Sequence, residues 1–156
     1  MGFNPDINVI YVDADGVCVN FEKGYEDLTG KLLNKGEVDW AIIGDRKNFY
    51  RDLEPMPDMW ELLHFVLPYE PFILTGIPSV ETVPEAADNK KEWFRKHGVD
   101  VPVICTRSKT KSNYCLPGDI LIDDWEKHKH LWVAKGGIWI THTSAKDTIE
   151  QLKRIL

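Results

Sequence analysis

Residues 9–18 read VIYVDADGVC, an apolar run that ends in two aspartates with one alanine between them and a glycine behind. The run is short and rich in β-branched side chains, which favours a β-strand over a helix. It does not alternate with polar residues, a pattern typical of a strand that is buried on both faces. We predict a first strand over 7–13, with Asp13 and Asp15 at the point where the chain leaves it.

Four further apolar runs resemble this one. Helical patterns separate some of them, at 83–97, which stops at Gly98, and at 144–155, which opens on Ser144 as a candidate N-cap. Strands that alternate with helices predict an α/β fold with a doubly wound, mostly parallel sheet. The four runs are 70–75 (EPFILT), 101–105 (VPVIC), 119–123 (DILID) and 137–141 (GIWIT).

The interval between the first two predicted strands, residues 19–68, is far longer than a single crossover requires. We interpret it as a small, mostly helical cap inserted into a core formed by residues 1–18 and 69–156. The last helix of the interval, 57–67, starts with a proline and carries apolar residues at core-facing spacing. This helix is therefore expected to pack back on the sheet.

The bulk composition is that of an ordinary globular protein, with 156 residues, 43% of them hydrophobic, and a formal net charge of −6. Because the chain lacks a long basic run, long nucleic acid is an unlikely partner. The three cysteines form no CxxC pair, which favours a reducing, cytoplasmic location. The first residues lack the basic flank and cleavage site of a secretory signal, so none is expected, and Asp6 stands where a myristoylation motif needs Ser or Thr. No apolar stretch approaches 18 residues, so no membrane segment is expected.

A second pair of carboxylates, Asp123 and Asp124, closes the fourth predicted strand. Ligands of open α/β sheets bind beyond the carboxyl ends of the strands, so both aspartate pairs could face one small volume. Two unit charges about 4 Å apart repel each other by roughly 4 kcal/mol at an effective dielectric constant near 20. A bound divalent cation would offset that repulsion, and an all-oxygen set of ligands suits Mg²⁺.

Other interpretations of these residues are weaker. The dipeptide Asp15-Gly16 alone would indicate only a turn. A calcium loop also opens with DxDG, but this chain has Val17 and Gly24 where that loop needs its third ligand and its final glutamate. His128 and His130 have a spacing that sends them to different faces of a helix, so we interpret them as solvated surface residues rather than zinc ligands.

VDADGV, then ILTG, then a lysine ahead of DILIDD resemble the four-motif pattern of the haloacid dehalogenase superfamily of phosphatases, which implies a Rossmann-like core. DGVCVNF, NFYRDLEPMP and LIDD are similar to the 5′(3′)-deoxyribonucleotidases and their phage and bacterial relatives. The resemblance implies that Asp13 is a nucleophile that forms an aspartyl-phosphate, and that Asp15 protonates the leaving alcohol and then activates water. It also implies Mg²⁺ held by the Asp13 side chain, the Asp15 backbone carbonyl and Asp124, with Asp123 as a neighbouring partner.

The resemblance assigns phosphate contacts to Thr75, Gly76 and a lysine that is not determined uniquely. We favour Lys111, which lies twelve residues before Asp123, and keep Lys109 as the alternative because TRSKT resembles the deoxyribonucleotidases. The lysine that is not used is expected to be a surface charge. Trp125 and the stretch TGIP depart from the relatives, which puts the substrate in doubt more than the mechanism.

The aromatic residues of the insertion could contact a substrate or form a small core. Phe21, close to the catalytic loop, is the stronger candidate for stacking on a base, and Trp40 is the weaker one. Phe49, Tyr50 and Trp60 are interpreted as core residues of the insertion.

The leading hypothesis is a Mg²⁺-dependent phosphatase, and within that class a 5′-nucleotidase that acts on a (deoxy)ribonucleoside monophosphate. One alternative keeps this chemistry but changes the substrate to a polynucleotide 3′-phosphate or a sugar phosphate. A third hypothesis is a catalytically idle module that binds phosphate or a nucleotide. The presence of Asp15 counts against it, because a binding module does not need an acid beside the nucleophile.

Overall fold

The computed structural model describes residues 9–156. The expectations for the amino terminus, and the first two residues of the predicted strand 7–13, lie outside these residues. The strands are β1 (Ile10–Val12), β2 (Phe72–Gly76), β3 (Val103–Thr106), β4 (Ile120–Asp123) and β5 (Ile138–Thr141). The α-helices are α1 (Phe21–Thr29), α2 (Trp40–Asp45), α3 (Met59–Val66), α4 (Ala86–Lys96), α5 (Lys129–Ala134) and α6 (Ala145–Ile155). The 3₁₀ helices are η1 (Leu67–Tyr69), η2 (Ser108–Tyr114) and η3 (Glu126–His128).

The five strands form one parallel sheet in the order β3-β2-β1-β4-β5. The chain moves from β1 toward one edge and then returns to the other side of β1, which makes the gap between β1 and β4 the topological switch point. Val12 is paired with Ile122, so Asp13 and Asp123 follow side by side where the two strands end. The predicted α/β fold with a doubly wound sheet is confirmed.

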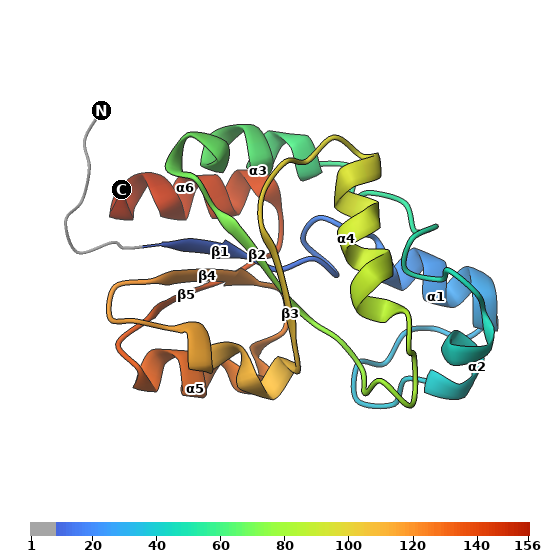
Figure 1. Ribbon diagram of the computed structural model, residues 1–156. Coiled ribbons are helices and arrows are strands. Elements are labelled where there is room, and N and C mark those ends of the chain that lie inside the picture. Colours follow the sequence, from blue (N-terminus) through green and yellow to red (C-terminus); the bar gives the residue numbers. More distant parts are fainter. Residues whose placement is uncertain (1–8) are drawn as a thin grey trace.

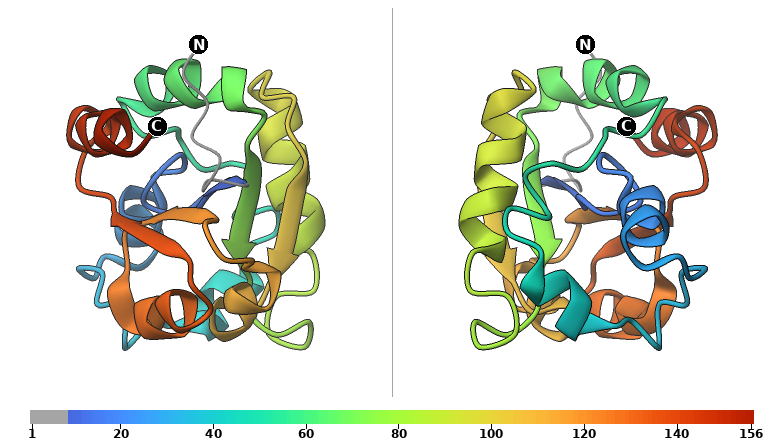
Figure 2. Two further views of the ribbon diagram at one scale, coloured as in Figure 1. Left: turned by 90° about the vertical axis from the view of Figure 1, so that its left-hand side faces the viewer. Right: turned by 90° about the vertical axis from the view of Figure 1, so that its right-hand side faces the viewer.

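Both faces of the sheet are buried, which explains why the strands read as unbroken apolar runs. Successive side chains of β1 point to opposite faces, so Ile10 and Val12 join one core while Tyr11 joins another, with Trp132 and Leu121. Helices α3, α4 and α6 cover the first face and α5 covers the second (Figure 1). Figure 2 shows α6, α3 and α4 following one another around the sheet, with α5 on the opposite side.

The ends of the core helices follow the signals in the sequence. The Ser144 hydroxyl accepts a hydrogen bond from the Asp147 amide (3.1 Å) and caps α6 as predicted. After α4 the chain turns at Gly98, whose φ of +74° is a conformation that glycine adopts at little cost. Helix α4 begins at Ala86 rather than at 83, because residues 79–85 form hydrogen-bonded turns.

The segment between β1 and β2 carries α1, α2 and α3. Helix α1 buries Phe21 and Tyr25 from one face, one helical turn apart, and with α2 it lies at the end of the molecule to which β1 leads (Figure 1). Helix α3 instead contacts α6, in the layer that covers the sheet. The division into a core and a cap of residues 19–68 stays a prediction, and the structure places α3 of that segment with the core helices.

Two of the three aromatic residues interpreted as core of the insertion are buried. Phe49 and Tyr50 pack with Phe21. The interpretation of Trp60 is wrong, because this side chain is 39% exposed on α3 and its ring contacts His64 instead. Within residues 9–156, no helix combines the length and the apolar character that crossing a bilayer requires.

Candidate active site

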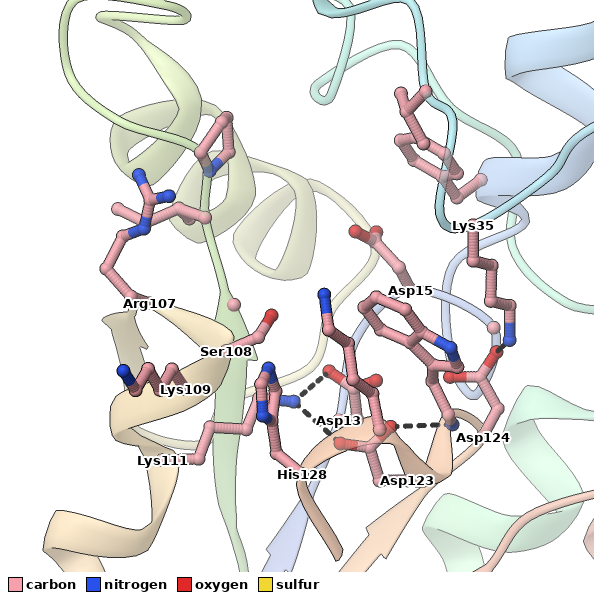
Figure 3. A pocket seen from close by; sticks show the side chains of 18 of the residues that line it. Asp13, Asp15, Lys35, Arg107, Ser108, Lys109, Lys111, Asp123, Asp124 and His128 are labelled. Carbon is pink, nitrogen blue, oxygen red and sulfur yellow. Dashed lines mark hydrogen bonds and ion pairs between the residues drawn. The ribbon is translucent and has the colours of Figure 1, made fainter.

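Three carboxylates meet at the ends of β1 and β4. One oxygen from each of Asp13, Asp123 and Asp124 lies within 4.8 Å of the others. Because the adjacent strands end in register, the sheet itself sets this spacing. Three of the four aspartates that the sequence places at strand ends are thus brought together, while the Asp15 side chain lies apart from them (Figure 3).

Lys111 lies between two of these carboxylates. Its ammonium group is 3.0 Å from Asp13 Oδ1 and 2.9 Å from Asp123 Oδ2, and the side chain is buried (Figure 3). Burial alone would lower the pKa of Lys111, but the two carboxylates outweigh it and hold the pKa above its usual value. Lys109 is exposed at the rim of the cavity, because two residues along a 3₁₀ helix turn a side chain to a different side.

The two oxygens of Asp13 have different surroundings. Oδ1 accepts hydrogen bonds from the Ala14 amide (2.8 Å) and from Lys111, whereas Oδ2 has no hydrogen-bond donor among the described residues. Burial, followed by the neighbouring Asp123 carboxylate, raises the pKa of Asp13 well above its usual value of 3.8. Asp13 is therefore a carboxylate held in one orientation, with one free oxygen and a need for positive charge nearby.

Asp124 is held from two sides. Its Oδ2 lies 2.7 Å from the Lys35 ammonium, which comes from the loop between α1 and α2 (Figure 3). On the other side is Gly16, where the Cβ atom of any larger residue would come within 2.0 Å of Asp124 Oδ2. Gly16 also has a φ of +83°. The glycine is thus required both by the turn after β1 and by the closeness of Asp124.

Replacing Gly16 with alanine should destabilise the protein by about 3 kcal/mol, because backbone strain adds to the displacement of Asp124. Gly30 is the matched control, since its φ is +70° but nothing lies within 4 Å of its missing Cβ atom. Gly30→Ala should cost only about 1 kcal/mol. Urea unfolding of both variants measures the difference in the free energy of unfolding. Equal losses of stability would show that a Cβ atom at position 16 does not clash with Asp124.

Asp15 is bound to Lys90, a residue that sequence reasoning missed. Lys90 is 3% exposed, and its ammonium donates to Asp15 Oδ2 (3.0 Å), Thr75 Oγ1 (2.7 Å) and the Gly76 carbonyl (2.8 Å). A signal for it was present, because Ala86, Lys90 and Trp93 have the spacing of one buried helix face. A lysine at such a position is rarely buried without a partner.

Thr75 and Gly76 are placed differently by the structure. Thr75 is fully buried and its hydroxyl is engaged by Lys90, so it does not line the cavity. Gly76 does line the cavity, and a Cβ atom there would come within 2.3 Å of Ser108 Oγ.

The site opens into a cavity of about 780 Å³, within the range of small-molecule sites. One wall carries Phe21, which is largely buried by stacking on Tyr25, and Trp40, which is 38% exposed. The other wall carries basic residues and His128. Of the two histidines predicted to be solvated, His130 is exposed, whereas His128 is only partly exposed in this wall and burial lowers its pKa. The basic residues of this wall are Arg107, Lys109 and Lys127.

The residues present fit the Mg²⁺ ion that the resemblance implies. The donors are oxygen atoms only, as Mg²⁺ prefers, and carboxylate oxygens that share one octahedral ion lie about 3–4 Å apart. One oxygen of each of the three aspartates lies within 4.8 Å of the others, so the donors are gathered closely enough to approach one ion.

Comparison with known proteins identifies the family. Residues 35–155 match the family described as 5′ nucleotidase, deoxy (Pyrimidine), cytosolic type C protein. No curated protein sequence matches the chain. The matched part includes Lys111 and the Asp123–Asp124 pair, and Asp13 and Asp15 precede it. The chain therefore belongs to this family of 5′-nucleotidases, which are phosphatases of the haloacid dehalogenase superfamily.

Proposed function

We propose that the protein is a Mg²⁺-dependent 5′-nucleotidase that hydrolyses (deoxy)ribonucleoside monophosphates through an aspartyl-phosphate on Asp13. The observation that carries the proposal is the convergence of Asp13, Asp123 and Asp124 around a buried Lys111, with Asp13 Oδ2 free to react. The family match supports the class of substrate.

In the first step Asp13 Oδ2 attacks the phosphorus of the monoester. Lys111 holds Oδ1 and keeps the nucleophile in one orientation, while its charge reduces the repulsion between the carboxylate and the dianionic phosphate. As the new O–P bond forms, the ester P–O bond breaks. Asp15 gives its proton to the departing oxygen, so that the nucleoside leaves as a neutral alcohol.

In the second step Asp15 accepts a proton from a water molecule. The water oxygen forms a bond to phosphorus and the Asp13–phosphate bond breaks, which releases inorganic phosphate and restores both aspartates. The same carboxyl group thus serves first as acid and then as base, and each turnover consumes one water molecule.

The Mg²⁺ ion would be held by the side chains of Asp13 and Asp124 and by the backbone carbonyl of Asp15. When bound, it would supply positive charge that stabilises the transferring phosphoryl group. Asp123 already accepts hydrogen bonds at both oxygens, from Lys111 and from the Trp125 amide (3.0 Å). We propose that it orients Lys111 and is not itself a primary metal ligand.

The nucleoside would occupy the cavity between its two walls. Phe21 and Trp40 offer apolar surface for a base, with Trp40 the more accessible of the two. Thr75, whose hydroxyl is buried, would act by holding Lys90 rather than by touching the phosphate.

A substrate panel tests the proposal. Release of inorganic phosphate should be fastest, by kcat/KM, from deoxynucleoside 5′-monophosphates, slower from 3′-monophosphates and sugar phosphates, and slowest from an oligonucleotide 3′-phosphate. A chelator should reduce the rate by at least about 100-fold, and Mg²⁺ should restore it. Tight binding of a monophosphate without release of phosphate would show a binding module instead.

A further inference from the structure

Lys90 is a buried cation to which the catalytic steps above give no direct task. It does not line the cavity, so it cannot touch a substrate there. Its three N–H groups have three acceptors on two different segments, the loop after β1 and the end of β2. Burying an ammonium group is costly, and this full set of partners is what makes it tolerable.

The backbone of Lys90 is fixed by the packing of α4. Trp93, on the same face of the helix, is buried and donates a hydrogen bond from its indole Nε1 to the Leu53 carbonyl (2.8 Å). The Tyr50 ring lies 4.7 Å from the Lys90 ammonium and adds a favourable contact with the cation. The position of the ammonium is therefore set before any substrate arrives.

Asp15 is held asymmetrically as a result. Lys90 binds Oδ2, whereas Oδ1 is buried and has no hydrogen-bond partner among the described residues. A buried oxygen without a partner is uncommon in folded proteins and calls for an explanation. Among the described residues, the contact to Lys90 is therefore the one hydrogen bond that orients this carboxyl group.

We propose that Lys90 is a positioning residue that fixes the acid–base carboxyl group of Asp15 in the orientation from which it exchanges the proton. The proposal rests on the role of Asp15 in the proposed function. A purely structural lysine would be satisfied by Thr75 and Gly76, which already join α4 to β2. The third contact reaches across to the loop that carries both catalytic aspartates.

The two steps of p-nitrophenyl phosphate hydrolysis separate a positioning role of Lys90 from a purely structural one. p-Nitrophenolate leaves without a proton, so formation of the aspartyl-phosphate should not depend on Asp15, whereas its hydrolysis requires Asp15 as a base. Rapid mixing with saturating substrate and Mg²⁺ resolves the two steps as a fast burst of p-nitrophenolate followed by steady turnover.

In Lys90→Met the burst rate should stay within about threefold of the wild-type rate of phosphoenzyme formation, while steady turnover falls at least about 30-fold. The burst amplitude should then approach one p-nitrophenolate per active site. Lys91→Met is the matched control, since Lys91 is the next residue of α4 and is exposed. It should leave both phases unchanged.

Equal losses in both phases of Lys90→Met, or no loss in either, would overturn the proposal. If circular dichroism shows that Lys90→Met is not folded, Lys90→Gln replaces it under the same criteria, because its amide can still donate to Thr75 or Gly76 but is uncharged and one bond shorter, so it cannot hold Asp15 as the ammonium group does. Asp15→Asn should show the burst pattern more strongly. If Asp15→Asn shows a burst but the Lys90 variant does not, the positioning role of Lys90 is refuted while the acid–base role of Asp15 stands. If Asp15→Asn shows no burst either, the acid–base role of Asp15 is refuted, and the role of Lys90 that rests on it is refuted as well.

Discussion

Asp13→Asn is expected to abolish phosphate release and at the same time to make the stability of the folded protein depend less on pH. The amide is a poor nucleophile, so kcat for a nucleoside 5′-monophosphate should fall by on the order of 10⁴ or more. The amide oxygen can still accept from the Ala14 amide and from Lys111, so the local geometry should persist. Retained turnover would remove Asp13 as the nucleophile.

The change in stability follows from the raised pKa of Asp13. A carboxyl group with a raised pKa in the folded state contributes stability that is full below its unfolded pKa and is lost as the pH rises through its folded pKa. Asp13→Asn has no carboxyl group to titrate at this position, so in a chelator its stability relative to wild type should increase as the pH rises, by on the order of 1 kcal/mol. Between pH 4 and 8 the midpoint of thermal unfolding should decline less with rising pH in the variant than in wild type. An equal decline in both proteins would contradict this expectation.

Lys111→Met is expected to damage both activity and folding. It leaves Asp13 and Asp123 buried beside each other without the ammonium group that now joins them. Removal of one partner from a buried ion pair costs about 3–5 kcal/mol, and loss of the cation from the transition state should lower kcat by about 10²–10³-fold. Urea unfolding and single-substrate kinetics measure the two effects.

Lys109→Met is the comparison for that variant, because Lys109 is exposed two residues away. Its stability should change by less than about 0.5 kcal/mol. Low pH or added Mg²⁺ should restore part of the stability of Lys111→Met, since either one reduces the repulsion between the two carboxylates. A larger loss of activity in Lys109→Met than in Lys111→Met would reverse the choice of lysine.

The fold could be predicted because both faces of the sheet are covered. Each strand then has to be apolar at every position, and runs such as those around Tyr11 and Leu121 stand out in the sequence. The proximity of Asp13 to Asp123 followed from the same reasoning, because it requires only that two parallel strands be neighbours. Local periodicity and the rule for strand ends were sufficient for both inferences.

Other parts of the site depend on side-chain directions and burial, which the local sequence pattern does not determine. Lys35 reaches Asp124 from a loop, and nothing in a loop sequence fixes the direction of a side chain. Lys90 was hidden because a lysine beside Lys91 suggests a solvated helix surface, although its spacing from Trp93 places it on the buried face. Thr75 stands at the expected strand end, but its burial could be seen only with α4 in place.

The place of β1 in the middle of the sheet has a consequence for how the site could diversify. Fraying of an edge strand leaves β1 paired on both sides, so the backbone at Asp13 is expected to open only when the centre of the sheet opens. The reacting groups therefore lie on the most stable part of the sheet, whereas Trp40 belongs to the segment between β1 and β2, outside the sheet. Substitutions in the segment between β1 and β2 can therefore change which leaving alcohol, here the nucleoside, the cavity accepts, while the residues that react with the phosphate stay the same.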